Sequence, residues 1–198
     1  GLGRSTGSGF PGESTGVLPN HPNWRAIERA TFAFGYGLTV TSLQLAQAYS
    51  VFANHGVFQP VSLVKRETSA ERKQLISPKI ARQIVDMLES VTGPGGTATR
   101  ARVDAYRVAG KTGTSHKAIA GGYAEDRYFS LFAGVAPASD PRIVAVVAID
   151  EPKGDYFGGL VAAPVFSKVV ADALRLMNIA PDDVEPVAKM DKKGDAAA

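Results

Sequence analysis

Cysteine is absent from the 198-residue sequence, and this absence excludes disulfide bonds, a thiol nucleophile and thiolate metal sites. Histidine is scarce. The three histidines lie far apart in the sequence and show no metal-ligand spacing such as H-E-x-x-H. We therefore expect no metal site. His116 could flank a cleft, as argued below, or be an ordinary exposed side chain, whereas His21 and His55 are expected on the surface or in loops.

A strong excess of one charge is also missing. The formal net charge is +3, and Lys and Arg are interleaved with acidic residues, without a basic helix or a series of aromatic residues that could stack on bases. Nucleic acid is therefore not an expected partner. The longest wholly apolar run, Ile143 to Ile149, is far shorter than the roughly 20 residues that span a bilayer.

The residues that are present indicate one globular domain. Hydrophobic residues make up 44% and charged residues 21% of the chain, which is the composition of a folded protein. From Pro181 onward charge, proline and alanine mix without apolar periodicity, which predicts a domain over residues 1–180 and a disordered tail over 181–198. The glycine-rich start, GLGRSTGSGFPGESTG, has neither Met nor a signal peptide, and we interpret the sequence as a piece of a longer protein.

The apolar pattern predicts three helices. Residues 1–37 are dense in Gly, Ser, Thr, Pro and Asn and are expected to form a loop. A first helix begins at Thr39 or Thr41 and stops at Gly56, with an apolar face of Leu45, Tyr49 and Phe52. A second begins after Ser77 with Pro78 at its first position, and its expected apolar face comprises Ile80, Ile84, Met87 and Val91. The last begins at Pro164, with a broad apolar face of Val165, Phe166, Val169, Val170, Leu174, Leu176 and Met177.

Extended runs alternate with these helices. A short one covers residues 57–67, a helical turn is expected within 97–103, and three longer runs cover 106–114, 128–136 and 142–150. The turn PASDP joins the last two runs and predicts an antiparallel hairpin. This order of elements predicts an α+β fold in which helices flank an antiparallel sheet.

The stretch RVAGKTGTS, residues 107–115, places Lys111 between glycines and hydroxyl side chains. A phosphate-binding P-loop would need glycine at the position of Ala105 and a helix directly after the lysine, and the sequence provides neither. The letters V-A-G-K resemble the lysine strand of protein kinases, but the H-R-D and D-F-G motifs are absent. A solvated strand lysine without a function is the simplest alternative to a catalytic one.

Acyl transfer would use each residue of the K-T-G-T run. On a strand that borders a cleft, Lys111 would place a positive charge near the proton network of a nucleophile. The hydroxyls of Thr112 and Thr114 could hold a substrate carboxylate, and Gly113 would let a substrate backbone come close. The Thr114 N–H could form half of an oxyanion hole. Our hypothesis is that Lys111, Thr112, Gly113 and Thr114 form the catalytic group, with both threonines also binding substrate.

Longer stretches carry a family resemblance. Lys-Thr-Gly is the third motif of penicillin-binding proteins and class A β-lactamases. The stretches IERATFAFGYGLTVTSLQLAQAYSVFANHG, MLESVTGPGGTATRA, FAGVAPASDPRIVAVVAID and YFGGLVAAPVFSKVVADALRLMNI resemble the C-terminal part of the transpeptidase domain of class B penicillin-binding proteins. Within that family they are most similar to the cell-division D,D-transpeptidases of the penicillin-binding protein 3 type. The resemblance covers residues 1–182.

This resemblance implies a fold, a reaction and partners. The fold would be the C-terminal portion of a penicillin-binding protein/β-lactamase-like transpeptidase domain. The reaction would be serine-type cross-linking of peptidoglycan stem peptides during septal wall synthesis, with β-lactams as acylating inhibitors and no cofactor. The complete protein would sit at the periplasmic face of the inner membrane, with its anchor outside this chain. Its partners would be the missing N-terminal part of the same protein and membrane-embedded division proteins.

Other functions stay open beside this one. A D,D-carboxypeptidase or β-lactamase-type hydrolase would share Lys-Thr-Gly but pass the acyl group to water. The region from Gly-Tyr-Gly-Leu to Ala-Gln-Ala favours a transpeptidase over these two. A non-catalytic scaffold could have kept the same fold.

The sequence departs from the family pattern in its nucleophile. The family places Ser-x-x-Lys and Ser-x-Asn before Lys-Thr-Gly, but no Ser-x-Asn occurs in this chain. One Ser-x-x-Lys, Ser62 to Lys65, follows Pro60 in a predicted extended segment and does not open a helix. We interpret this match as coincidence. The nucleophile is therefore expected outside this chain, and the chain alone is expected to be inactive.

Two adjacent aromatic residues, Tyr156 and Phe157, lie between the last predicted strand and the last predicted helix. They could be core residues, but the glycines on both sides favour a mobile loop whose rings cover a ligand. The family places an aromatic wall of the substrate cleft in this loop. We therefore assign Tyr156, Phe157 and His116 to substrate binding, and we expect residues 151–163 to act as a lid.

Overall fold

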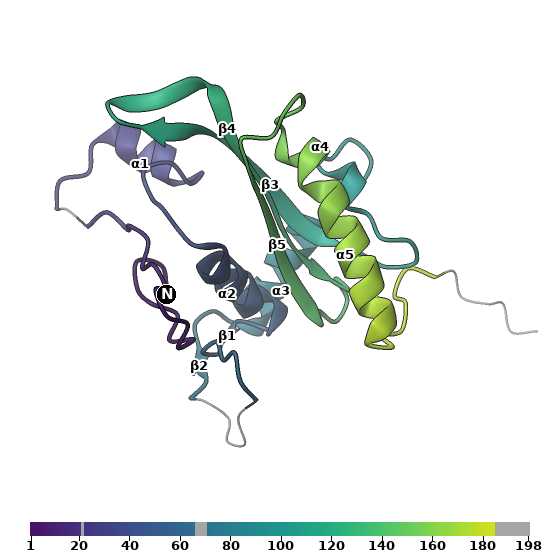
Figure 1. The fold of residues 1–198 in the computed structure, drawn as a ribbon. Coiled ribbons are helices and arrows are strands. Elements are labelled where there is room, and N and C mark those ends of the chain that lie inside the picture. The colour runs from purple at the N-terminus through teal and green to yellow at the C-terminus, as the bar shows by residue number, and fades with distance from the viewer. Residues whose placement is uncertain (21, 66–70, 185–198) are drawn as a thin grey trace, which may run out of the picture.

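The computed structural model describes residues 1–20, 22–65 and 71–184 (Figure 1). Its helices and strands follow one another as α1 (Ala26–Phe32), α2 (Ser42–Ala53), β1 (Val57–Phe58), β2 (Lys73–Gln74), α3 (Pro78–Glu89), the 3-10 turn η1 (Thr99–Ala101), β3 (Ala109–Ile119), β4 (Gly122–Ala136), β5 (Ile143–Asp150), α4 (Gly158–Val161) and α5 (Ala163–Leu176). Within this part of the chain, helices pack on an antiparallel sheet, which confirms the predicted α+β class.

The central sheet has the order β3-β4-β5, with both pairs antiparallel. Its register pairs Lys111 with Ala133 and Phe132 with Val147. Figure 1 shows α5 on one side of this sheet and α2 and α3 on the other. The sheet therefore separates two hydrophobic layers, and β3 is the strand at one edge.

The layer under α5 is the larger part of the core. Phe132 of β4 and Phe166 of α5 are both fully buried, and their rings meet edge to face with centroids 4.8 Å apart. Burying one such side chain contributes about 1.5–3 kcal/mol to stability. On the opposite side of the sheet, Val85 of α3 packs against Ala109 and Val135. Both layers thus bear on the strands that carry the Lys111 motif.

Local capping explains where two predicted helices begin. Thr41 accepts a hydrogen bond from the Gln44 N–H and starts α2, and Ser77 accepts one from the Ile80 N–H and starts α3. These side chains satisfy N–H groups that have no partner inside the helix. The predicted starts after Thr41 and Ser77 are confirmed, and α5 begins one residue before Pro164.

The predicted apolar faces of α3 and α5 were partly wrong. In α3 the buried residues are Ala81 and Val85, whereas Ile80 and Met87 are 48% and 64% exposed. The small Ala81 lets the helix approach closely, which the spacing of large apolar residues does not indicate. Only three of the seven residues predicted for the apolar face of α5 are buried, and the other four stay 42–82% exposed, namely Val165, Val169, Leu176 and Met177.

The N-terminal region contains a helix that was predicted as loop. Helix α1 begins after Arg25, which is not a usual capping residue. The Arg25 N–H donates to the Glu28 carboxylate at 2.8 Å, and the Arg25 guanidinium binds the same carboxylate. Because the cap is completed by this pair rather than by Ser, Thr, Asp or Asn, the usual start signal is missing.

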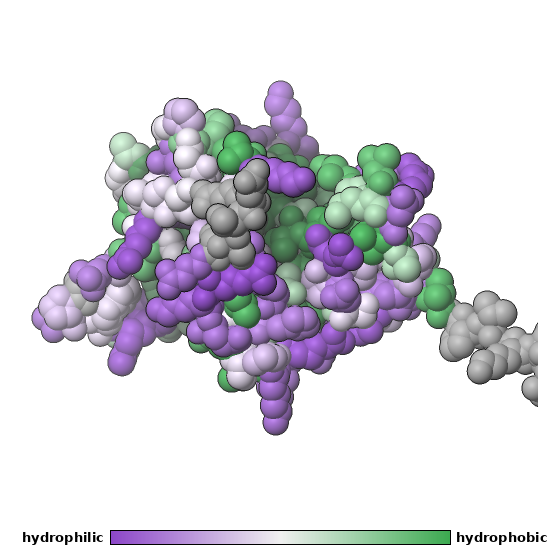
Figure 2. All heavy atoms as spheres, turned by 90° about the horizontal axis from the view of Figure 1, so that it is seen from below, coloured by the Kyte–Doolittle hydropathy of each residue, from purple (hydrophilic) through white to green (hydrophobic). Residues whose placement is uncertain are grey.

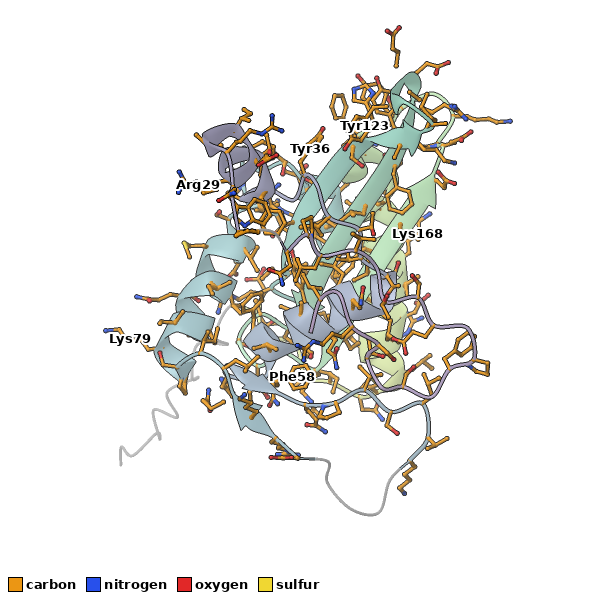
Figure 3. The ribbon with its side chains drawn as sticks, turned by 90° about the vertical axis from the view of Figure 1, so that its left-hand side faces the viewer. Arg29, Tyr36, Phe58, Lys79, Tyr123 and Lys168 are labelled. Atoms are coloured by element: carbon orange, nitrogen blue, oxygen red, sulfur yellow. The ribbon has the colours of Figure 1, made fainter. Side chains whose placement is uncertain are left out.

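Strands β3 and β4 extend beyond their predicted ends at residues 114 and 128. They continue into a hairpin that turns at Ala120 and Gly121. Tyr123 near the turn is 55% exposed and meets Tyr36, with ring centroids 6.2 Å apart (Figure 3). Both faces of this tip are largely exposed, so its sequence lacks the apolar alternation by which strands are recognised.

The predicted tail boundary at Pro181 lies too early. Asp182 accepts hydrogen bonds from the Arg107 N–H at 2.8 Å and from the Ser139 N–H at 3.1 Å. The Asp183 N–H donates to the Ala105 carbonyl at 3.0 Å. These residues are therefore tied to the domain, and the rest of the predicted tail, 185–198, lies outside the described residues.

The surface is mostly polar but leaves apolar areas uncovered. Figure 2, a view from below, shows hydrophilic side chains over most of this face and hydrophobic ones gathered in a hollow near its centre. No helix within residues 1–20, 22–65 and 71–184 is both long and apolar enough to cross a membrane.

Candidate active site

The Lys111 side chain projects from the edge strand β3 and is exposed to solvent. Its Nζ donates to the Thr112 carbonyl at 3.0 Å and lies 3.4 Å from Thr112 Oγ1. An ammonium group has three N–H donors. At least one donor is therefore left for a group that approaches β3 from solvent.

The hydroxyls of Thr112 and Thr114 lie on one face of β3, because side chains alternate along a strand. Thr112 Oγ1 is 3.2 Å from Thr97 Oγ1, which comes from the turn after α3. Thr114 Oγ1 accepts the Gly158 N–H at 3.0 Å. Since Gly158 supplies the proton of that bond, the Thr114 hydroxyl keeps its own proton for an acceptor such as a carboxylate.

Glycines allow the close contacts behind the motif. A Cβ on Gly113 would lie 2.9 Å from Leu131 Cγ, so the structure gives packing against β4 as the reason for glycine at this position. A Cβ on Gly158 would lie 2.3 Å from the Leu131 carbonyl oxygen, and one on Gly159 would lie 2.0 Å from the Thr97 carbonyl oxygen. The segment after β5 can therefore lie directly on β3 and β4 only because it has glycine at these places.

Four rings form a continuous row beside the motif. The row, which we term the aromatic wall, consists of His116, Tyr128, Tyr156 and Phe157, with successive centroid distances of 4.7, 4.0 and 4.5 Å. The two tyrosines are stacked with only 10° between their planes. Desolvation, together with the nearby Tyr156, raises the pKa of Tyr128. The structure thus brings together the three ring-bearing residues predicted to bind substrate, and it adds Tyr128 to them.

Tyr128 was missed because its position depends on strand register. It lies on β4 directly opposite His116 of β3, and the strand predicted over 106–114 ended before His116 and so could not show this pairing. The segment that carries Tyr156 is also less free than its glycines indicate. The Ser130 hydroxyl donates to the Tyr156 carbonyl, and residues 158–161 form helix α4 where a loop was predicted.

An ion cluster fixes the start of the same segment. Lys117 Nζ lies 2.8 Å from Asp150 Oδ2 and 2.7 Å from Glu151 Oε1. Arg127 approaches Glu151 at 3.6 Å. The hydrogen bond to Asp150, followed by the one to Glu151, raises the pKa of Lys117. The cluster joins the exposed parts of β3, β4 and β5 to Glu151, the first residue after β5.

Comparison with known proteins decides the family. The model of the penicillin-binding protein transpeptidase domain matches residues 1–171. The chain belongs to the penicillin-binding protein transpeptidase family. It is 48% identical over 186 residues to a probable peptidoglycan D,D-transpeptidase, PbpC, of Pseudomonas aeruginosa, covering 93% of this chain and 33% of that protein. It is 45% identical over 183 residues to the peptidoglycan D,D-transpeptidase FtsI of Escherichia coli K12, covering 92% and 31%.

A solved structure agrees with this assignment. The apo transpeptidase domain of Burkholderia pseudomallei penicillin-binding protein 3 superimposes with a TM-score of 0.86 at 45% identity, covering 92% of this chain and 56% of that one. The chain therefore spans about a third of the curated relatives' length and just over half of the solved transpeptidase domain. The similarity confirms the predicted family and fold.

The Ser-x-x-Lys match at Ser62 lies apart from this family motif. Ser62 is exposed in the segment after β1, and its hydroxyl donates to the Val64 carbonyl at 2.6 Å. Figure 1 shows this segment at the lower end of the molecule, and residues 59–65 belong to no helix. His55 is exposed at the end of α2, and His21 lies outside the described residues. The geometry of Ser62 is thus not that of a nucleophile that opens a helix.

Neither a metal-binding cluster nor the cavity beside α5 involves the Lys111 motif in the described part of the chain. Among the described residues no group of three His, Cys, Asp or Glu side chains could hold a metal ion. A cavity of about 640 Å³ lies between residues 102–106 and α5, and neither the Lys111 motif nor the aromatic wall lines it. The motif lies instead on β3, an edge strand of the three-stranded sheet.

Proposed function

We propose that the complete protein is a serine D,D-transpeptidase that cross-links peptidoglycan stem peptides, and that this chain forms one wall of its active site. The observation that carries the proposal is the open edge of β3, where the Lys111 ammonium and the hydroxyls of Thr112 and Thr114 adjoin the aromatic wall. This group of residues belongs to a chain of the transpeptidase family. Cationic, hydroxyl and aromatic groups together suit an acyl donor with a carboxylate and an apolar body.

The reaction proceeds by two acyl transfers. A serine supplied by the rest of the protein attacks the carbonyl between the two D-alanines of a stem peptide, and its proton passes to the departing D-Ala amine. The amine of a neighbouring stem peptide then attacks the acyl-enzyme and releases the serine. Lys111 stabilises the deprotonated serine and its proton network, and the Thr114 N–H stabilises the negative oxygen of the transition state.

The substrate contacts follow from the same geometry. Thr112 and Thr114 donate to the terminal carboxylate of the donor peptide, and His116, Tyr156 and Phe157 bind its apolar parts together with Tyr128. β-Lactams imitate the donor, acylate the serine and stay attached. The Tyr156 segment acts as a lid whose exposed ring is that of Phe157, which is 54% exposed.

The rest of the protein completes the site. Solved and curated relatives are longer than this chain, and the exposed apolar residues of α5, among them Val169, leave surface for another part of the domain to cover. We assign the nucleophile to that part. We also propose that the complete protein acts at the periplasmic face of the inner membrane with membrane-embedded division proteins, in septum formation and maintenance of cell shape; the similarity to the D,D-transpeptidase FtsI supports this proposal. The proposed reaction needs no cofactor, and we expect no nucleic-acid partner.

Labelling with a fluorescent penicillin tests the proposal. The complete protein is expected to form a covalent adduct that survives denaturation, and the 198-residue chain alone is expected to form none. An unlabelled complete protein would instead support the scaffold alternative. Labelling of the short chain that disappears in Ser62→Ala would show that Ser62 is the nucleophile after all.

A second measurement separates the hydrolase alternative. The acyl-enzyme formed from a D-Ala-D-Ala peptide is offered water alone or water with a D-amino acid as acceptor. A transpeptidase transfers the acyl group to the amine, and a carboxypeptidase or β-lactamase releases mainly the hydrolysed product.

A further inference from the structure

We propose that Thr97 is a positioning residue for the acyl donor's carboxylate: its hydroxyl donates to Thr112 Oγ1 and thereby turns the Thr112 proton toward the ligand. The inference deepens the proposed function and rests on it. Thr97 lies outside the K-T-G-T run, in the turn between α3 and η1, fifteen residues before Thr112.

Three segments meet at Thr97. Its hydroxyl oxygen is 3.2 Å from that of Thr112, and its carbonyl oxygen lies where a Cβ on Gly159 would come within 2.0 Å. The same Cβ would be 3.4 Å from Thr112 Cγ2. The backbone of Thr97 is therefore packed against helix α4 while its side chain contacts β3, which holds the hydroxyl in place.

Either hydroxyl of the Thr97–Thr112 pair could donate, and the proposed contact between Thr112 and the ligand carboxylate selects Thr97 as the donor. The Thr112 hydroxyl has one proton and two lone pairs. Lys111 Nζ, 3.4 Å away, can only donate to it. If Thr97 also donates, both lone pairs are filled and the proton is left for a carboxylate, which only accepts hydrogen bonds. If Thr112 donated to Thr97 instead, it would have no proton for the ligand.

Thr114 is arranged by the same logic. The Gly158 N–H fills one lone pair of its oxygen at 3.0 Å, so its hydroxyl proton is also free. The hydroxyls of Thr112 and Thr114 then project from one face of β3 as donors. Each accepts a hydrogen bond in turn, Thr112 from Thr97 and Thr114 from the Gly158 N–H. Donation to a hydroxyl oxygen strengthens the bond that this hydroxyl makes in turn. Thr97 should therefore matter for anionic ligands and little for neutral ones.

The test compares one penicillin, as its free carboxylate and as its methyl ester, on the complete protein. The variants are Thr97→Val, which keeps the shape and removes the donor, Thr97→Ala as a second loss of the hydroxyl, and Thr97→Ser, which restores it. Thr99→Val is the matched control, because Thr99 is an exposed threonine two residues away in η1. Acylation rate constants and thermal midpoints are measured for each.

Thr97→Val and Thr97→Ala should lower acylation by the carboxylate form about threefold to tenfold, the worth of one hydrogen bond, and change acylation by the ester less than about twofold. Thr97→Ser should restore the preference, and Thr99→Val should behave as the unchanged protein. Equal losses on acid and ester, or an unchanged preference, would overturn the role of Thr97 while leaving the transpeptidase assignment intact. A complete protein that neither form acylates would overturn both.

Discussion

Two segments meet at the candidate active site and are held in place by different means. Residues 109–114 of β3 are paired along their length with β4, and the pair Ala109 and Val135 at one end is buried. Residues 151–157 belong to no strand or helix and are held by the Ser130 contact to Tyr156, the Tyr128 stack and the Lys117 ion cluster. The charged and hydroxyl groups therefore lie on backbone that the sheet fixes, whereas the position of the aromatic rings depends on a few separate side-chain contacts.

The largest effect should come from removing the charge on the sheet-held segment. Lys111→Ala in the complete protein should slow acylation by penicillin at least about 100-fold, as expected for a group that stabilises transition-state charge, and leave the thermal midpoint nearly unchanged because the side chain is exposed. Lys79→Ala, at an exposed lysine of α3 (Figure 3), is the control. Near-normal acylation of the Lys111 variant would remove the catalytic assignment.

A methyl group at Gly158 should disturb both segments together. In Gly158→Ala the new Cβ would lie 2.3 Å from the Leu131 oxygen and 2.7 Å from the Gly113 oxygen. Both are backbone atoms that cannot move aside cheaply, so we expect a loss of about 2–3 kcal/mol in unfolding free energy. Acylation should also fall, because the N–H that supports Thr114 is displaced.

The control for this change separates crowding from backbone strain. Gly121→Ala at the hairpin tip adds a methyl group with no atom within 4 Å, at a φ of 89°. It should cost about 1 kcal/mol through strain alone and leave acylation as it was. If both variants impaired acylation equally, the close approach of Gly158 to β3 would not be the cause.

The same contrast explains which parts could be read from the sequence. Lys111 to Thr114, and the helix start at Ser77, are local signals, because a motif or a cap is complete within a few residues. Tyr128 and Thr97 reach the site only through strand register and a turn that returns to β3. Single spacings cannot indicate such contacts, and for the same reason the buried face of α3 was misplaced.

Removal of the aromatic wall's outer rings should have a selective effect. Replacing Tyr156 and Phe157 by alanine should weaken capture of β-lactams with apolar side chains by about 1–2 kcal/mol in transition-state terms, and affect small polar ones less. The Tyr128 stack with Tyr156 would also be lost, so a modest drop in melting temperature is expected. The Phe157 ring is 54% exposed, so Phe157→Ala alone should leave the stability unchanged. It should still cause part of the loss in capture of β-lactams with apolar side chains.

The outcome separates a binding role from a packing role for these rings. Equal losses for both ligand classes, with a large fall in melting temperature, would mean that the aromatics hold the fold. Acylation rates for the two classes, measured beside thermal midpoints, decide between the roles.

The smallest effect should come from loosening the start of residues 151–157, where Glu151 binds Lys117. Lys117 is bound by Asp150 and Glu151, and these hydrogen bonds raise its pKa above the ordinary lysine value. A raised pKa in the folded state means that the cluster stabilises the fold fully below the unfolded lysine's pKa of about 10.4, and that this contribution is lost as the pH rises through the folded value.

Lys117→Met keeps the length of the side chain and removes the charge. The variant should therefore show a slightly lower thermal midpoint at neutral pH, and a difference from the unchanged protein that shrinks at strongly alkaline pH. Faster hydrogen exchange of the Glu151 N–H, which donates to the Tyr128 carbonyl at 2.9 Å, would place the loosening at this segment. An unchanged exchange rate there would mean that the ring stack and the Ser130 contact hold the segment without help from the ion cluster.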